Sequence, residues 1–252
     1  MTIRPFAALL LLALAPAVAR AQKTPRPVPD APPPPEYAPV RSFGWAGGSL
    51  ALALPTGEFK NYVHVGGGLN GFAAIKLDPA GALSLRLDGT FLLYGAETRR
   101  VPLGGGGLQL ITVDVTTSNT IFSLNFGPQL TATRGPVRPY AMGGVGFSYF
   151  WTSSSVSGSD QSNQPFASST NFGDGTFAVR AGGGVWVQVG RGRTPIWLDL
   201  GAQYVWNGQV SYLRPGSIDT SISPPLIHPI TSETHLWLIH LGVSAGLVPK
   251  AL

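Results

Sequence analysis

Near its C-terminal end the chain carries residue types that could catalyse hydrolysis. Glu233, His240 and Ser244 are an acid, a base and a hydroxyl nucleophile, the set that activates a serine in hydrolases. The residues around His240 alternate apolar with small or polar types, which is typical of a β-strand. Residues four apart on a strand are separated by about 13 Å, far beyond hydrogen-bond reach. We therefore expect no catalytic pair and no enzymatic activity.

Other candidates for chemistry indicate neither a metal nor a cofactor. His64, His228 and His235 lack the spacing of metal ligands. The chain contains no Cys, which excludes disulfides, thiolate metal sites and Cys nucleophiles. Residues 104–107 form a glycine run, but residues 108–115 alternate like a strand, whereas a phosphate-binding loop is followed by a helix. We interpret the run as a flexible loop or hairpin extension.

The composition favours one all-β domain. Charged residues make up only 12% of the 252 residues, and the chain contains 33 Gly and 23 Pro. Soluble globular domains average about 25% charged residues, so the chain is poor in charge. Its 44% of hydrophobic residues is too many for a disordered chain.

The first 41 residues read as an export signal and a linker. Arg4, an apolar run over residues 6–14 and the cleavage pattern Ala19-Arg20-Ala21 predict a signal peptide over residues 1–21. The apolar run is shorter than the ~20 residues of a membrane-spanning helix. Residues 22–41 are rich in Pro and predict an extended periplasmic linker, which serves as a tether or, alternatively, as a ligand for a proline-binding partner.

Residues 42–252 form the predicted barrel domain, in which eight segments alternate with the period of a strand. Every charge inside these segments falls on the small or polar side of the alternation, never on the apolar side. A soluble sandwich would place many charges on its outer faces, so the polar side looks like an interior and the apolar side like a surface against lipid. The segments are residues 45–54, 66–77, 82–94, 120–132, 137–151, 176–190, 196–206 and 234–247.

The connections and the aromatic residues agree with a membrane barrel. Short links (78–81, 133–136 and 191–195) alternate with long ones (55–65, 95–119, 152–175 and 207–233). We therefore predict an all-β fold: a closed eight-stranded antiparallel up-and-down transmembrane β-barrel with short periplasmic turns and long extracellular loops. An aromatic girdle is expected on its loop side. Its members are Phe91, Tyr149, Trp151, Phe177, Tyr204, Trp206 and Trp237. The periplasmic girdle is thin, with little beyond Trp45 and Trp197, and Trp197 faces inward by the alternation.

Over residues 42–247 this pattern resembles the small eight-stranded outer-membrane barrels of the OmpA/OmpX-like kind. The resemblance implies a place in the cell outer membrane, with contact to outer-membrane lipids, lipopolysaccharide and the barrel-assembly machinery. Many such barrels end in an aromatic residue, where this chain has Leu247, and we expect no cell-wall-binding domain of the OmpA kind. Some small outer-membrane barrels are lipid A deacylases with a Ser-His pair and an acid, which keeps a lipid A-modifying enzyme among the alternatives.

Eight strands enclose an interior that side chains just fill, so we predict no open pore. The interior charges need partners, and we expect Asp88 and Asp199 to be shared among the neighbouring cations. The predicted lumen charge network consists of Lys76, Arg86, Asp88, Arg138, Arg180, Asp199 and His240.

The outer loops are the expected place of function, because binding residues concentrate on loops held by a rigid scaffold. These loops carry four basic and seven acidic residues, a net charge of −3, which argues against nucleic-acid binding. The sequence favours a structural or adhesive surface-binding role. A narrow channel or a conduit for hydrophobic ligands is the alternative.

Overall fold

The computed structural model describes residues 42–102, 112–158, 165–191, 194–213, 218–219 and 226–249. The predicted signal peptide, the proline-rich linker and the glycine run at 104–107 lie outside these residues. By its internal contacts the chain divides into residues 1–37 and 38–252, and the fold below is that of the second unit. No helix in the described ranges is long and apolar enough to cross a membrane.

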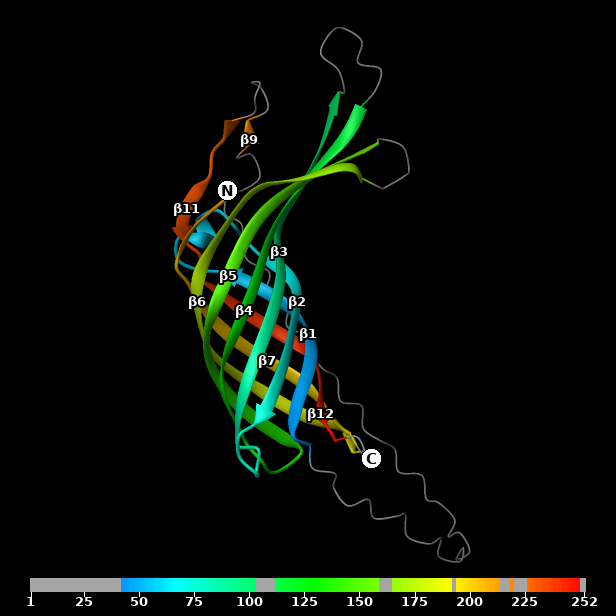
Figure 1. The fold of residues 1–252 in the computed structure, drawn as a ribbon, viewed down its shortest axis with the longest axis vertical. Helices are drawn as coiled ribbons and strands as arrows, with labels where there is room; N and C mark the ends of the chain where they lie inside the picture. The colour runs from blue at the N-terminus through cyan, green and yellow to red at the C-terminus, as the bar shows by residue number, and fades with distance from the viewer. Residues whose placement is uncertain are drawn as a thin grey trace, which may run out of the picture. The chain divides into compact units, whose positions relative to one another are not determined.

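Eight antiparallel strands form a closed barrel (Figure 1) in which each strand pairs with its neighbours in the sequence. The first and last strands close it in a continuous ladder from Gly44↔Leu247 to Pro55↔Leu236. The predicted fold class is therefore confirmed. The strands are β1 (Gly44–Pro55), β2 (Gly66–Lys76), β3 (Leu83–Pro102), β4 (Thr112–Thr131), β5 (Val137–Gly158), β6 (Pro165–Arg191), β7 (Pro195–Asn207) and β12 (Leu236–Leu247).

The remaining elements belong to two of the connections. A short 3-10 helix, η1 (Phe59–Asn61), lies between β1 and β2. Between β7 and β12, β8 (Gln209–Tyr212) pairs with β11 (Ile230–Glu233), and β9 (Ile218–Asp219) pairs with β10 (Leu226–Ile227). We call the end of the barrel that holds η1 and β8 the long-loop end, and the opposite end the short-turn end.

The barrel wall is apolar outside and mostly polar at mid-height inside. Leu50, Leu69, Leu85, Phe126 and Leu241 represent outward rows that are about half exposed or more. Inward rows alternate with them, as the pleat of a strand requires. Among the described wall residues below the aromatic girdle, every charged side chain lies inside or at the short-turn rim. This surface matches hydrocarbon, and a closed barrel satisfies its backbone hydrogen bonds there.

Four neighbouring strands are much longer than the others. β3 to β6 span 20, 20, 22 and 27 residues, whereas β2 spans 11 and β7 spans 13. Their upper parts leave the barrel together and remain paired (Figure 1). The links expected at 95–119 and 152–175 are therefore largely strand rather than loop in their described residues. Their Thr and Val residues are compatible with this, because β-branched residues suit a pleated sheet.

Candidate functional site: a filled lumen and a projecting sheet

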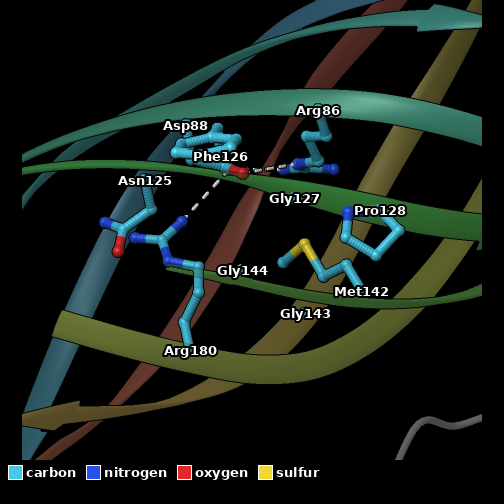
Figure 2. Close-up of a pocket in the computed structure, with 10 residues that line it drawn as sticks. All are labelled: Arg86, Asp88, Asn125, Phe126, Gly127, Pro128, Met142, Gly143, Gly144 and Arg180. Carbon is cyan, nitrogen blue, oxygen red and sulfur yellow. Dashed lines mark hydrogen bonds and ion pairs between the residues drawn. The ribbon is translucent and has the colours of Figure 1, made fainter. Parts of the chain in front are cut away.

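At mid-height the lumen holds a buried ion triad (Figure 2). The Asp88 carboxylate accepts 2.9 Å hydrogen bonds from Nε and Nη2 of Arg86 on the same strand. Its Oδ1 also lies 3.3 Å from Nη1 of Arg180 on β6. Gln129 accepts a 2.8 Å hydrogen bond from Arg86, and all three ions are at most 3% exposed. Asp88 is thus shared by two of the cations in the predicted network.

Asp199 has other partners than expected. Its Oδ1 accepts a 2.8 Å hydrogen bond from the Tyr140 hydroxyl and lies 3.5 Å from Nε2 of His240. Tyr140 and His240 are themselves 3.0 Å apart. Gly201 makes this cluster possible, because a Cβ there would come within 2.6 Å of the His240 ring. The expectation that Asp199 is shared among lysine and arginine cations is therefore wrong.

Lys76 and Arg138 lie apart from both clusters, half-buried at the short-turn rim. The Lys76 ammonium donates a 2.7 Å hydrogen bond to the Ser42 carbonyl. The Arg138 guanidinium lies 4.4 Å from the ring centre of Trp197. Long cationic side chains reach toward water from such positions. The predicted seven-residue network is thus two buried clusters and two separate rim cations.

The candidate hydrolase residues do not form a pair. His240 is 1% exposed and contacts Tyr140 and Gln203, whereas the Ser244 hydroxyl has no hydrogen-bond partner within the described residues. Glu233 lies on β11, and its carboxylate contacts His235 at 3.1 Å. Within the described part of the chain, no three His, Asp or Glu side chains are grouped as metal ligands.

An aromatic layer packs directly against the two buried clusters and fills the lumen toward the short-turn end. Trp186 is its centre, with ring centres of Trp45 and Tyr140 at 5.3 Å and a stacked Phe72 at 6.1 Å. Trp197 packs edge-on against Trp45 at 6.3 Å. Trp45 was expected at the periplasmic interface and is instead buried inside. The alternation along β1 predicts that Trp45 points inward, because Trp45 lies on the same face of the strand as the inward Gly47 and Ser49.

An apolar layer that the alternation of the strands does not predict fills the lumen at the long-loop end. Wall strands contribute its outer shell, and the β1–β2 and β7–β12 connections contribute the side chains that fill it. We call the space inside this shell the apolar chamber. The shell residues are Ala51, Ala53, Leu92, Tyr94, Ile121, Phe150, Ala178, Val205, Leu236 and Leu238, and the filling residues are Phe59, Val63, Val210 and Tyr212.

The seven girdle residues all lie on outward rows toward the long-loop end. Five are 43–61% exposed, and Trp151 and Tyr204 are half-buried against neighbouring rings. Trp151 contacts Phe91 at 5.8 Å and Tyr149 at 6.0 Å between ring centres. Tyr204 contacts Trp206 at 4.5 Å and Trp237 at 5.1 Å. This band is where a membrane interface would fall. The exposed members are Phe91, Tyr149, Phe177, Trp206 and Trp237.

Above the girdle, β3 to β6 form a sheet with hydroxyl-rich rows. One row runs Thr98↔Thr116↔Ser155↔Ser168 across all four strands. Thr98 and Thr116 are hydrogen-bonded at 2.9 Å, and an exposed Arg100–Asp114 pair joins β3 to β4. This ion pair lowers the pKa of Asp114. We call this four-stranded extension the projecting sheet.

A closed eight-stranded barrel that is apolar outside and filled inside has the fold of the small outer-membrane β-barrels, as the sequence predicted. No family model matches the sequence. No curated protein matches it either.

The solved structures that are similar include three small outer-membrane proteins. Neisserial surface protein A is 15% identical with a TM-score of 0.45, over 82% of this chain and 98% of that one. Ail, the attachment invasion locus protein of Yersinia pestis, is 12% identical with a TM-score of 0.36, over 80% and 98%. A major outer membrane protein of Thermus thermophilus is 17% identical with a TM-score of 0.36, over 79% and 98%.

Proposed function

We propose that the protein is an integral outer-membrane barrel that binds an external surface through the projecting sheet and neither transports solutes nor catalyses a reaction. Outer-membrane lipids and lipopolysaccharide would cover its apolar belt, and the barrel-assembly machinery would insert it. The observation that carries this proposal is the contrast between a filled lumen and a paired four-stranded sheet that continues beyond it. Segments that only connect the barrel strands would not need to form strand pairs with one another over so many residues.

The lumen argues against transport. The apolar, ionic and aromatic layers follow one another along the barrel axis, so a solute meets side chains at every height. The pocket among Arg86, Asp88, Asn125 and Arg180 leaves no room for a water-sized sphere. We expect no steady single-channel conductance in planar bilayers. A resolvable steady conductance would favour the narrow-channel alternative.

The two edges of the projecting sheet differ in charge. The β3 edge contains Glu97, Arg99 and Arg100, and charged side chains protect an edge from pairing. Residues 165–173 on the β6 edge contain no charge. Over residues 165–171 this edge has a strand partner only on its β5 side within the described ranges. Exposed edges bind extended chains through backbone hydrogen bonds, so the β6 edge is the better candidate for contact.

Adhesion of cells displaying the protein tests this proposal. Cells with the wild-type protein should adhere to epithelial monolayers more than cells with the empty vector. Ser168→Lys should reduce the difference, because it places a charge on the β6 edge. Thr98→Lys is the matched control, since Thr98 stands in the same cross-strand row at the opposite edge, and it should adhere like wild type. Equal adhesion with and without the protein would overturn the proposal.

Two controls complete the design. Folded and unfolded forms of each variant are compared by electrophoresis of unheated samples, so that a loss of adhesion is not a loss of the barrel. Mass spectrometry of lipid A from cells with and without the protein tests the enzyme alternative. We expect identical lipid A species, and a change in acylation would contradict the non-catalytic assignment.

A further inference from the structure

The apolar chamber is filled from outside the barrel wall. Phe59 of η1 reaches inward and its ring packs edge-on against Tyr94 at 5.8 Å, Phe150 at 6.2 Å and Tyr212 at 5.3 Å. Phe59 is 1% exposed, yet its neighbours Glu58 and Lys60 are exposed. At this point the segment around η1 covers the chamber, with Phe59 facing it and Glu58 and Lys60 facing outward.

Thr56 and Glu58 attach the cover to neighbouring segments by hydrogen bonds. The Thr56 amide donates to the His235 carbonyl at 2.9 Å, and the hydroxyls of Thr56 and Tyr204 are 2.9 Å apart. Beyond Thr56, the Glu233 amide donates a 3.3 Å hydrogen bond to Glu58 on the flank of η1. Between these attachments Gly57 has a φ of +59° and open space around it, which suits a hinge. The burial of Phe59 and Val63 in the apolar cluster adds to the attachment of η1.

One polar atom in the chamber has no partner. The Tyr94 hydroxyl is buried in the shell and makes no hydrogen bond within the described residues. Buried hydroxyls are normally paired, and an unpaired one requires an explanation. A ligand with one hydroxyl or carbonyl group would satisfy it while its apolar part replaces the Phe59 ring.

The chamber is closed below. Asn70 and Thr90, joined at 2.8 Å, and Ser123 and Ser148, joined at 2.7 Å, belong to the polar layer beneath it. The aromatic layer closes the lumen further down. A molecule that entered would therefore be held rather than passed through, which distinguishes a binding site from a conduit.

We propose that the apolar chamber binds a small, mainly apolar molecule carrying one hydrogen-bonding group, admitted when η1 lifts and Phe59 leaves the shell. Because pockets for such ligands are largely apolar with a few placed polar groups, the Tyr94 hydroxyl is assigned as the group that orients it. This site is independent of the β6 edge of the projecting sheet.

Methyl NMR of the full barrel in lipid nanodiscs can test the site with 2-naphthol as the probe. Ile121 lines the chamber, whereas Ile75 and Ile239 face outward at 58% and 38% exposure. Labelled Ile methyl groups therefore report chamber binding and lipid partitioning separately. We expect a saturable shift of Ile121 with cross-relaxation to the probe, and only a linear drift at Ile75 and Ile239.

Two variants identify the contacts. Phe59→Ala removes the ring that competes for the chamber and should tighten 2-naphthol binding at least about fivefold, a threshold well below the roughly 150-fold equivalent of one buried ring. Tyr94→Phe should weaken 2-naphthol binding about two- to tenfold, the range of one hydrogen bond, and leave naphthalene binding unchanged. If wild type shows no saturable shift at Ile121, the proposal is overturned, and binding in Phe59→Ala alone would then mean an engineered cavity only.

Discussion

Replacing Asp88 with Asn keeps the side-chain volume but removes the anion that Arg86 and Arg180 share. Arg86 would retain its 2.8 Å hydrogen bond to Gln129, and Arg180 its 3.3 Å hydrogen bond to Thr90. Two guanidinium groups would then remain buried beside neutral acceptors. Breaking a buried ion pair from one side costs about 3–5 kcal/mol. We expect Asp88→Asn to lower the free energy of unfolding by that amount.

The matched control is the exposed pair of Arg100 and Asp114, which has the same 2.9 Å contact as Arg86 and Asp88. Exposed ion pairs contribute little because water and salt screen them. Asp114→Asn should therefore leave the unfolding free energy unchanged within error. A triple variant, Arg86→Met, Asp88→Leu and Arg180→Met, removes every charge of the triad together. It should be more stable than Asp88→Asn alone, since apolar replacement of a whole buried ion group is often neutral or stabilising.

The assay is equilibrium unfolding by guanidinium chloride in lipid vesicles, followed by tryptophan fluorescence and by the mobility of unheated samples. Trp186 and Trp197, buried in the aromatic layer, report loss of the lumen packing directly. Equal losses for Asp88→Asn and Asp114→Asn would refute the reasoning, because burial would then have no effect. A triple variant less stable than Asp88→Asn would refute it as well.

Three further outcomes are expected. Leu87→Arg, on the outward belt, should destabilise the barrel in lipid by about 2–4 kcal/mol, whereas Thr98→Arg on the projecting sheet should not; vesicle unfolding compares them. Asp199→Leu removes the acceptor of two buried side chains and should lower the temperature at which the compact gel band disappears, and an unchanged temperature would contradict this. The Leu83 amide, donating at 2.6 Å, lowers the pKa of Asp78, so this contact stabilises the fold above the ordinary Asp pKa and is lost as the pH falls through the lowered value. Such a carboxylate takes up its proton between about pH 5 and pH 2. Over this pH range the denaturant midpoint of Asp78→Asn should therefore fall less than that of the wild type.

The alternation of the strands predicts the closed barrel and the inward direction of the wall charges, because a pleated strand sends neighbouring side chains to opposite faces. It fails where both faces are apolar. At Leu92 and Leu93 the first side chain enters the chamber and the second faces outward, and no period-two signal separates them. The continuous apolar run from Phe91 to Tyr94 was itself a signal, since strands buried on both faces lose their alternation.

The partners of the buried charges could not be predicted for a different reason. Pairing across the lumen depends on strand tilt and register, which the sequence of one strand does not contain. Arg180 reaches Asp88 from β6 across the interior, and Tyr140 reaches Asp199 from β5. The projecting sheet was predicted only in part: the alternation over residues 108–115 indicated a strand, which the described residues 112–115 form. The remainder was missed because its Ser and Thr residues suit loops as well as exposed strands. Only the pairing of all four strands shows that these residues form an exposed sheet rather than loops.

The two apolar layers and the buried ions depend on one another. A charge pair is strong only where water is excluded, and an unpaired charge is costly for the same reason. The chamber seals the long-loop end with Phe59 and Tyr212, and the aromatic layer seals the other end around Trp186. The triad therefore lies where a shift of one residue in strand register would place an ion against lipid. The layered interior thus selects one register for the wall strands, and this fixes the geometry from which the projecting sheet extends.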